Sequence, residues 1–310
     1  MIVTVTMNPA IDKTVDVPRL ECGGLNRISH VEYDAGGKGI NVSKTIKELG
    51  GKSIATGFLG GNAGRTIQSV LEDWGIENDF VWVDGETRTN TKVVEQRGGV
   101  TELNEPGPII TAKQMQQLYE KLEGYAAEDV LFVLAGSIPS GVDKHCYRKI
   151  VEMVHGKGAK ILLDADGELF KVALDAGPDI IKPNRVELEE YAQFDYHASE
   201  EELAQIAVKL HEKGIETIAI SMGGEGALFV GKDYEIFCPG LRVEAHSTVG
   251  AGDAMVAALA YGVDGKLGIE EMVRTCIATS AGAVTTIGTK PPTREVIDGL
   301  KEKVIMERHR

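Results

Sequence analysis

One aspartate stands directly after a loop that could bind an anion. The segment Ser247-Thr248-Val249-Gly250-Ala251-Gly252-Asp253 leads into an apolar, helix-forming run at residues 254–262. The backbone amides of Gly250, Ala251 and Gly252 can converge on one anion, and the start of the following helix adds positive dipole charge. A carboxylate there repels phosphate unless it has another role, such as accepting a hydroxyl proton during phosphoryl transfer. This loop alone fits equally well with Asp253 as a helix N-cap.

A second glycine-rich segment, Ala35-Gly36-Gly37-Lys38-Gly39-Ile40-Asn41, opens another expected helix that runs through Leu49. Its glycines would let a ligand lie close against the backbone. Asp12 follows the first strand, where its carboxylate could accept hydrogen bonds from sugar hydroxyls or form an Asx turn. No G-x-G-x-x-G motif follows a strand and opens a helix, which disfavours an NAD-dependent enzyme.

The elements that must position these residues follow an α/β pattern. Helical stretches that close on glycine are followed by apolar strands, which we expect at Ser53–Leu59, Lys160–Asp164 and Thr217–Ser221 and at residues 80–83, 130–135 and 180–182. This alternation predicts a mostly parallel sheet covered by helices, with functional loops at the carboxyl ends of the strands. We expect one domain over residues 1–310, with the strands of a small antiparallel lid inserted at about 13–34 and 86–104.

Composition limits the class of protein further. The 310 residues are 43% hydrophobic, and the net charge of −14 argues against nucleic-acid and anionic-membrane partners. The chain has no apolar run of membrane-spanning length and no basic signal-peptide start, so we expect a cytoplasmic protein. The four cysteines form no C-x-x-C pair, which favours buried thiols over a zinc site or a disulfide framework.

The two glycine-rich segments together resemble the two signatures of the ribokinase-type (PfkB) carbohydrate kinases. Three further motifs follow in that family's order, at residues 136–139, 182–187 and 221–226. The resemblance implies a ribokinase-like three-layer α/β sandwich with a small β-sheet lid. It also implies ATP as co-substrate, Mg²⁺, and in some members K⁺. Ser247 stands where relatives often have Asp or Asn, which leaves a potassium site open.

The resemblance also implies roles for individual residues. Asp253 would be the catalytic base, and the amides of Gly250, Ala251 and Gly252 would form the anion hole for the transferring phosphoryl group. The nucleotide would be bound by Asn184, Ser221, Gly223, Gly226 and Thr248, and Glu187 with Asn184 would organise Mg²⁺ largely through water. The sugar would be held by Asp12, Gly37, Asn41 and Ser137.

Basic residues in the lid and its neighbours indicate a substrate that already carries a phosphate. Arg27, Lys38, Arg88 and Lys92, with Asn90, form a cationic cluster in an acidic protein. The lid motifs resemble those of members acting on fructose 1-phosphate more than those of members acting on tagatose 6-phosphate. The resemblance therefore implies phosphorylation of the C6 hydroxyl of D-fructose 1-phosphate. Tagatose 6-phosphate and fructose 6-phosphate remain open as acceptors, as does a non-catalytic sugar-phosphate sensor. Exposed lid edges also favour a homodimer through the lid.

Overall fold

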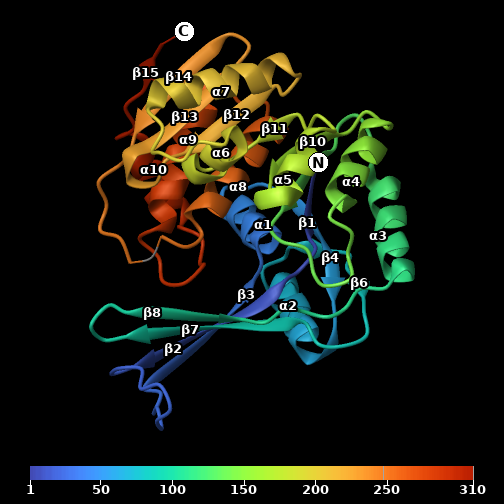
Figure 1. The fold of residues 1–310 in the computed structure, drawn as a ribbon, viewed down its shortest axis with the longest axis vertical. Coiled ribbons are helices and arrows are strands. Elements are labelled where there is room, and N and C mark those ends of the chain that lie inside the picture. Colours follow the sequence, from blue (N-terminus) through green and yellow to red (C-terminus); the bar gives the residue numbers. More distant parts are fainter. Residues whose placement is uncertain (247, 310) are drawn as a thin grey trace.

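A large central sheet organises the computed structural model, which describes residues 1–246 and 248–309 (Figure 1). Along the sheet the order is β15-β14-β13-β12-β11-β10-β9-β1-β4-β5, and β6 also pairs with β4. The strands are β1 (Ile2–Thr6), β4 (Ser53–Leu59), β5 (Glu77–Asn78), β6 (Val81–Trp82), β9 (Leu131–Ala135), β10 (Lys160–Asp164), β11 (Ile180–Ile181), β12 (Thr217–Ser221), β13 (Gly226–Gly231), β14 (Tyr234–Pro239) and β15 (Glu307–Arg308). From β12 to β5 all pairings are parallel, whereas β13, β14 and β15 form an antiparallel edge.

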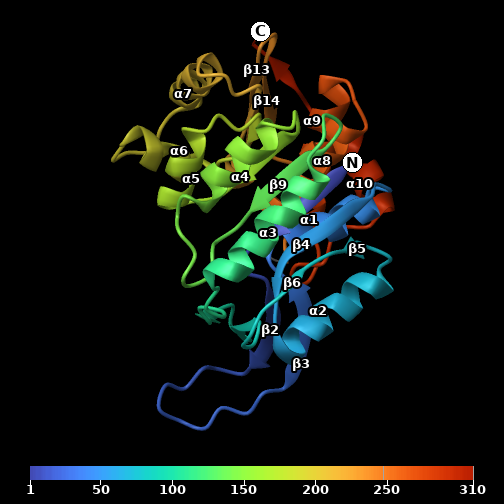
Figure 2. The same ribbon diagram turned by 90° about the vertical axis from the view of Figure 1, so that its right-hand side faces the viewer.

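Helices cover both faces of this sheet (Figure 2). One face packs against α3 (Ala112–Tyr125), α4 (Cys146–His155), α5 (Gly167–Leu174), α6 (Arg185–Ala192) and α7 (Glu200–Glu212). The other face packs against α1 (Lys38–Glu48), α8 (Ala251–Asp264), α9 (Ile269–Ala283) and α10 (Arg294–Lys301), while α2 (Gly61–Asp73) closes a smaller apolar cluster beside the lid. Strands such as β1 and β9 are buried throughout because both of their faces are covered. The predicted three-layer α/β fold is confirmed.

A second, small sheet projects from the body in Figure 1. It contains β2 (Ala10–Val17), β3 (His30–Gly36), β7 (Arg88–Glu95) and β8 (Val100–Asn104), in the order β3-β2-β7-β8. The expectation of an antiparallel lid is wrong at its centre, because β2 and β7 pair in parallel. Both strands enter the lid from the carboxyl-end side of the main sheet, β2 after β1 and β7 after β6, so they run outward together.

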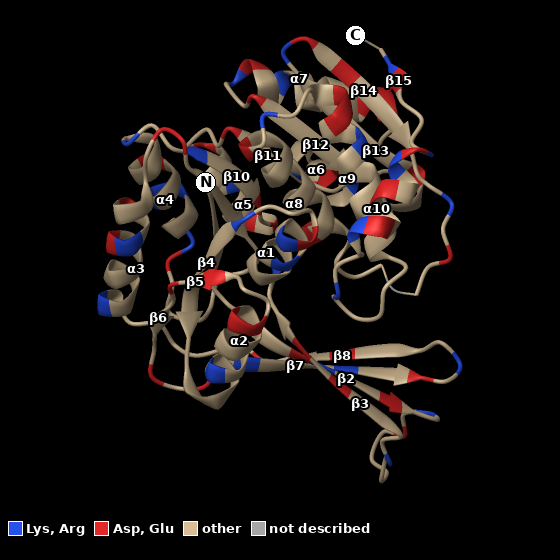
Figure 3. Ribbon diagram, turned by 180° about the vertical axis from the view of Figure 1, so that it is seen from behind, with Lys and Arg blue, Asp and Glu red and all other residues tan. Residues whose placement is uncertain are grey.

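The composition of the chain also predicted buried cysteines and no helix of membrane-spanning length. Cys146, Cys238 and Cys276 are buried as predicted, but Cys22 lies exposed in the loop between β2 and β3. No helix within the described residues is long and apolar enough to cross a membrane. Figure 3 shows acidic and basic residues interspersed over the body and the lid.

Candidate active site

A large cavity lies where the carboxyl ends of the parallel strands meet the lid. Its volume is about 900 Å³, and its wall includes the residues that end β1, β9, β10 and β12, namely Thr6, Ala135, Asp164 and Ser221. Open parallel sheets place their ligand sites at this edge. With the exception of Arg27, every site residue that we predicted from the sequence lines this cavity.

Asp253 lies in the first turn of α8, and only 8% of its surface is exposed. Gly250 is the N-cap of this helix and has a left-handed backbone, with φ of 90°. Asn41, on α1, donates a hydrogen bond of 2.9 Å from Nδ2 to Oδ2 of Asp253. Burial and, to a lesser extent, the nearby Asp164 carboxylate raise the pKa of Asp253 to about 6, although Asn41 and two lysines oppose the shift. Desolvation therefore outweighs the hydrogen bond from Asn41 and the two lysine charges, and the carboxylate is a stronger base than an ordinary aspartate.

A buried basic centre lies beside this aspartate. Asp164 ends β10 and forms ion pairs with the Nζ atoms of Lys182 at 3.2 Å and Lys38 at 3.3 Å. Burial alone would raise the pKa of Asp164, but the two ammonium groups outweigh it and lower the pKa. Lys182 Nζ also lies at the start of α8, since a Cβ added at Gly252 would be 3.6 Å from it. Two cations thus adjoin the loop that carries the expected anion hole.

Sequence reasoning missed the role of this centre. Lys38 was expected to bind the phosphate that the sugar already carries, but it lies against Asp164 in the body. Lys182 and Asp164 were given no site role. A signal for both existed, because each is a charged residue at the carboxyl end of an apolar strand.

The lid end of the cavity holds Asp12 and Asn90, which face each other across the parallel β2–β7 pair. Asn90 donates a hydrogen bond of 3.2 Å from Nδ2 to Oδ1 of Asp12. A Cβ at Gly36 would lie 2.0 Å from Oδ2 of Asp12, so only glycine fits beneath this carboxylate. Within the described residues, the side-chain oxygens of Asn8, Asn41 and Asn90 are buried without a hydrogen-bond partner. These acceptors suit the hydroxyl groups of a sugar.

The predicted cationic cluster is dispersed. Arg88 donates hydrogen bonds to the carbonyl oxygens of Asn8 at 3.0 Å and Glu105 at 3.3 Å, so its guanidinium is held at the cavity wall. Lys92 faces Glu102 at 3.6 Å. Arg27 lies exposed in the β2–β3 loop and does not line the cavity. Among the lid cations Arg27, Arg88 and Lys92, Arg88 therefore lines the cavity without forming an ion pair with an acidic side chain of the described residues.

The opposite end of the cavity is built from backbone turns. Ser221, Gly223, Gly226 and Thr248 line it together with Asn184 and Glu187. Asn184 is the N-cap of α6 and forms a capping box with Glu187: Asn184 Oδ1 accepts from Glu187 N at 2.8 Å, and Glu187 Oε2 accepts from Asn184 N at 2.9 Å. The bridge between Asn184 and Ser221 joins this helix start to the end of β12.

Two metal sites were expected from the sequence, one for potassium and one for magnesium. Ser247, on which the potassium expectation depends, lies outside the described residues. Within the described residues, no group of three His, Cys, Asp or Glu side chains could hold a metal ion. Glu187 and Asn184 stay the candidates for organising magnesium.

Comparisons with known proteins agree with this geometry. The family model described as "pfkB family carbohydrate kinase" matches residues 5–295. The 1-phosphofructokinase of Vibrio cholerae is 34% identical over 303 residues, which cover 98% of this chain and 95% of the relative. The 1-phosphofructokinase of Bacillus subtilis is 36% identical over 308 residues, which cover 99% and 100%.

Solved structures of phosphofructokinase-2 from Escherichia coli also match this fold. The complex with substrates and products is 27% identical, with a TM-score of 0.93, and covers 97% of this chain and 98% of that one. The complex with potassium has the same identity and coverage and a TM-score of 0.92. A tetrameric inhibited form is 26% identical, with a TM-score of 0.90 and the same coverage.

Proposed function

This chain belongs to the pfkB family of carbohydrate kinases, and on that premise we propose that it transfers the γ-phosphoryl group of ATP to the C6 hydroxyl of D-fructose 1-phosphate. The products are D-fructose 1,6-bisphosphate and ADP. As a member of this family, the protein is a phosphotransferase with an alcohol group as acceptor. The observation that carries the proposal is the buried Asp253 carboxylate at the start of α8, with Lys182 and Lys38 beside it.

In the proposed reaction Asp253 accepts the proton of the C6 hydroxyl as the oxygen attacks the γ-phosphorus and the bond to the ADP oxygen breaks. The raised pKa of Asp253 supports this role, because a base near the working pH accepts a proton more readily than an ordinary aspartate. The amides of Gly250, Ala251 and Gly252 and the ammonium of Lys182 would stabilise the charge on the transferring group. Asp164 would hold Lys182 and Lys38 in place for this purpose.

Magnesium would be organised by Glu187 and Asn184. Both offer the hard oxygen donors that Mg²⁺ prefers, and the capping box commits Glu187 Oε2 while leaving Oε1 outside it. Two such ligands fit an ion that keeps most of its waters and binds chiefly to nucleotide phosphates. Once bound, the ion would neutralise charge on the β- and γ-phosphates.

The sugar would lie between the body and the lid. Asp12, Asn41 and Asn90 would hydrogen-bond its hydroxyl groups, with the backbone at Gly37 and the hydroxyl of Ser137 completing that wall. Arg88 would bind the C1 phosphate, since a guanidinium matches phosphate in geometry as well as charge.

Two relatives named 1-phosphofructokinase, at 34% and 36% identity, favour fructose 1-phosphate over tagatose 6-phosphate and fructose 6-phosphate. A non-catalytic sensor is disfavoured by Asp253, because burying a carboxylate with a raised pKa costs stability, and Asp12, Asn41 and Asn90 already offer hydrogen-bonding groups to the sugar. Potassium activation, a homodimer through the lid and a cytoplasmic location stay predictions. Potassium is bound in one structure of phosphofructokinase-2, and another is a tetramer, so cation dependence and association state should both be measured.

The position of the new phosphate tests the proposal. We would incubate the purified protein with Mg-ATP and fructose 1-phosphate and follow the mixture by ³¹P NMR. The proposal predicts a bisphosphate with monoester signals at C1 and C6, formed in step with ADP. Unchanged ATP and fructose 1-phosphate under conditions where the protein is folded would contradict it.

A further inference from the structure

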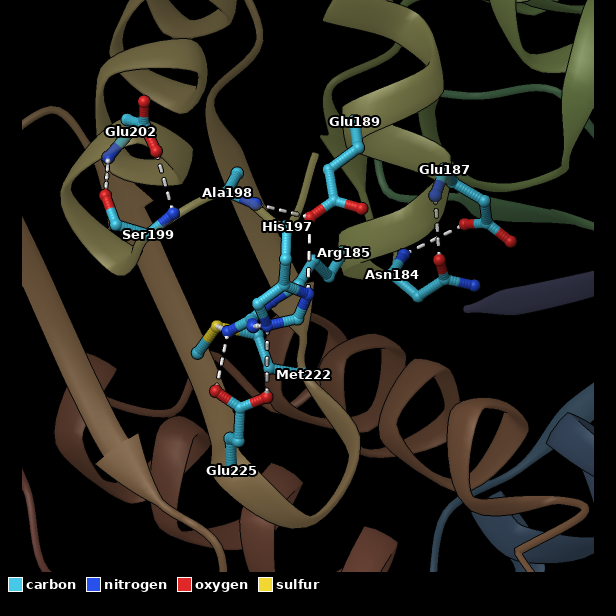
Figure 4. A network of polar contacts seen from close by, with 10 residues as sticks. All are labelled: Asn184, Arg185, Glu187, Glu189, His197, Ala198, Ser199, Glu202, Met222 and Glu225. Carbon is cyan, nitrogen blue, oxygen red and sulfur yellow. Dashed lines mark hydrogen bonds and ion pairs between the residues drawn. The ribbon is translucent and has the colours of Figure 1, made fainter. Parts of the chain in front are cut away.

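Arg185, the first residue of α6, is a buried arginine behind the proposed nucleotide end of the cavity (Figure 4). It directly follows Asn184, and only 8% of its surface is exposed. An arginine is rarely buried unless its charge is paired. Its partners therefore indicate what the side chain is for.

Two of these partners come from the turn that follows β12 and one from the segment before α7. Arg185 Nη2 donates hydrogen bonds to Oε2 of Glu225 at 2.9 Å and to Sδ of Met222 at 3.1 Å. Nη1 contacts the ring of His197, which precedes α7. Figure 4 shows the guanidinium and the His197 ring side by side, both facing the Glu225 carboxylate, whose Oε1 lies 3.7 Å from His197 Nε2. The side chain thus joins the start of α6 to a turn distant in sequence.

This turn needs an external support. Gly223–Glu225 forms a short 3₁₀ turn in which Gly223 and Gly224 line the cavity and are exposed. Gly223 has a left-handed backbone, with φ of 58°, and two adjacent glycines lose much conformational freedom when they are fixed. Backbone hydrogen bonds hold the turn from Met222 N to Gly226 O at 2.9 Å, from Glu225 N to Met222 O at 3.2 Å and from Gly240 N to Glu225 O at 3.1 Å, and none of them reaches α6.

We propose that Arg185 and Glu225 form a clamp that fixes the Gly223–Glu225 turn against the start of α6, so that both walls of the nucleotide end are set before ATP binds. Arg185 and Glu225 are positioning residues in this proposal, because their bond acts through the turn and through Asn184. The inference rests on the proposed function only in assigning this end of the cavity to MgATP.

A purely structural ion pair is the alternative, and the placement of Glu225 argues against it. The Glu225 side chain is 61% exposed, so the pair adds little to the core, yet it lies on a turn that lines the cavity. A clamp changes nucleotide binding and spares sugar binding, whereas a general loss of stability affects both.

The test uses Glu225→Gln as the main variant, because it removes the charge but keeps the size of the side chain and an amide oxygen that can still accept a hydrogen bond from the buried guanidinium. Arg185→Lys keeps the charge but removes the planar fork that reaches two partners. Arg148→Met is the matched control, since Arg148 forms an exposed ion pair of 2.9 Å with Glu152 within α4, remote from the cavity. Isothermal titration calorimetry would give Kd for MgATP, and initial rates would give KM for fructose 1-phosphate.

We expect Kd for MgATP to rise about tenfold in Glu225→Gln and in Arg185→Lys, which corresponds to one charge-assisted hydrogen bond. KM for fructose 1-phosphate and kcat at saturating ATP should stay within about twofold, by the same measure, and the control should match the wild type. The double variant should bind MgATP more tightly than the sum of the two single losses predicts, because both changes break the Arg185–Glu225 bond.

Wild-type affinity for MgATP in Glu225→Gln would overturn the clamp, and so would an equal loss of affinity for sugar and nucleotide. Calorimetry needs no acceptor sugar, so the clamp can be judged separately from the proposed reaction. A wild-type protein that binds MgATP but does not phosphorylate fructose 1-phosphate would refute the substrate and leave the clamp test valid.

Discussion

Asn41 and Asp253 are 212 residues apart in the chain, and a hydrogen bond of 2.9 Å joins them at the centre of the cavity. Asn41 comes from the first turns of α1 and Asp253 from the first turn of α8, so the starts of two helices meet here. The amide of Asn41 is one of the groups that oppose the rise in the pKa of Asp253. The contact therefore links the expected sugar site to the strength of the expected base.

We predict that kcat/KM falls as the pH drops through about 6, because Asp253 must be ionised to accept a proton and its pKa is raised to about 6. A sugar phosphate also titrates near this pH, with a second pKa of about 6. The informative comparison is thus with Asn41→Ala, in which the substrate titration is unchanged. Loss of the amide should move the midpoint of the profile to higher pH. Identical midpoints in the two proteins would contradict this account of Asp253.

Asp253→Asn should abolish activity and raise the stability of the fold at neutral pH. Turnover should be lost while both substrates still bind. Because the pKa is 3.8 for an ordinary aspartate and about 6 here, ionisation of Asp253 destabilises the fold above pH 6 by up to about 3 kcal/mol. This loss of stability begins as the pH rises above 3.8, the pKa of an ordinary aspartate, and is absent below it. The variant should therefore melt at a higher temperature than the wild type at pH 7.5, with the difference shrinking towards pH 4. Scanning calorimetry at both pH values checks this, and an unchanged or lower Tm at pH 7.5 would count against it.

Lys182→Met should lower kcat by about 10²–10³-fold with little change in KM for fructose 1-phosphate, since its ammonium lies beside Gly252, where we propose that charge develops on the transferring group. The single change also leaves Asp164 with one cation, which can destabilise the fold. The double variant Lys182→Met with Asp164→Asn removes that imbalance. If the double variant is as stable as the wild type and still slow, the charge itself is required. Recovery of wild-type kcat in the double variant would show that Lys182 serves only to balance Asp164.

Arg88→Met should raise KM for fructose 1-phosphate by about tenfold or more and leave KM for MgATP unchanged, because the guanidinium faces the lid end of the cavity. Lys92→Met should have the smaller effect, since Lys92 already faces Glu102 at 3.6 Å. Initial rates with each substrate varied in turn give both constants. A larger effect at Lys92 than at Arg88 would contradict the assignment of the phosphate to Arg88.

Much of this site follows from local patterns in the sequence. β4, β10 and β12 begin and end at the predicted residues, because helix-ending glycines and apolar runs delimit them. Asp253 and Asn41 were predicted next to the glycines that bring backbone to the cavity. Such signals depend on a few neighbouring residues, so one chain suffices to find them.

The features that the sequence did not predict depend on distant segments. Arg27 and Arg88 both lie in lid segments and look alike as isolated basic residues, but only the chain path decides that Arg88 lines the cavity. The parallel pairing of β2 with β7 likewise depends on where both strands leave the body. The raised pKa of Asp253 depends on burial by several elements, whereas the helix start, which favours the ionised form, is visible locally.

The central claim concerns the acceptor, and the most direct measurement is ADP release with Mg-ATP and each of four acceptors in parallel: fructose 1-phosphate, tagatose 6-phosphate, fructose 6-phosphate and unphosphorylated fructose. Our account predicts that kcat/KM for fructose 1-phosphate exceeds the other three by at least about tenfold, the value of one good phosphate contact. A preference for either 6-phosphate would contradict the proposed substrate and reverse the orientation of the sugar between Asp253 and Arg88. Absence of turnover with all four sugars would contradict the assignment of this site to ketohexose phosphates.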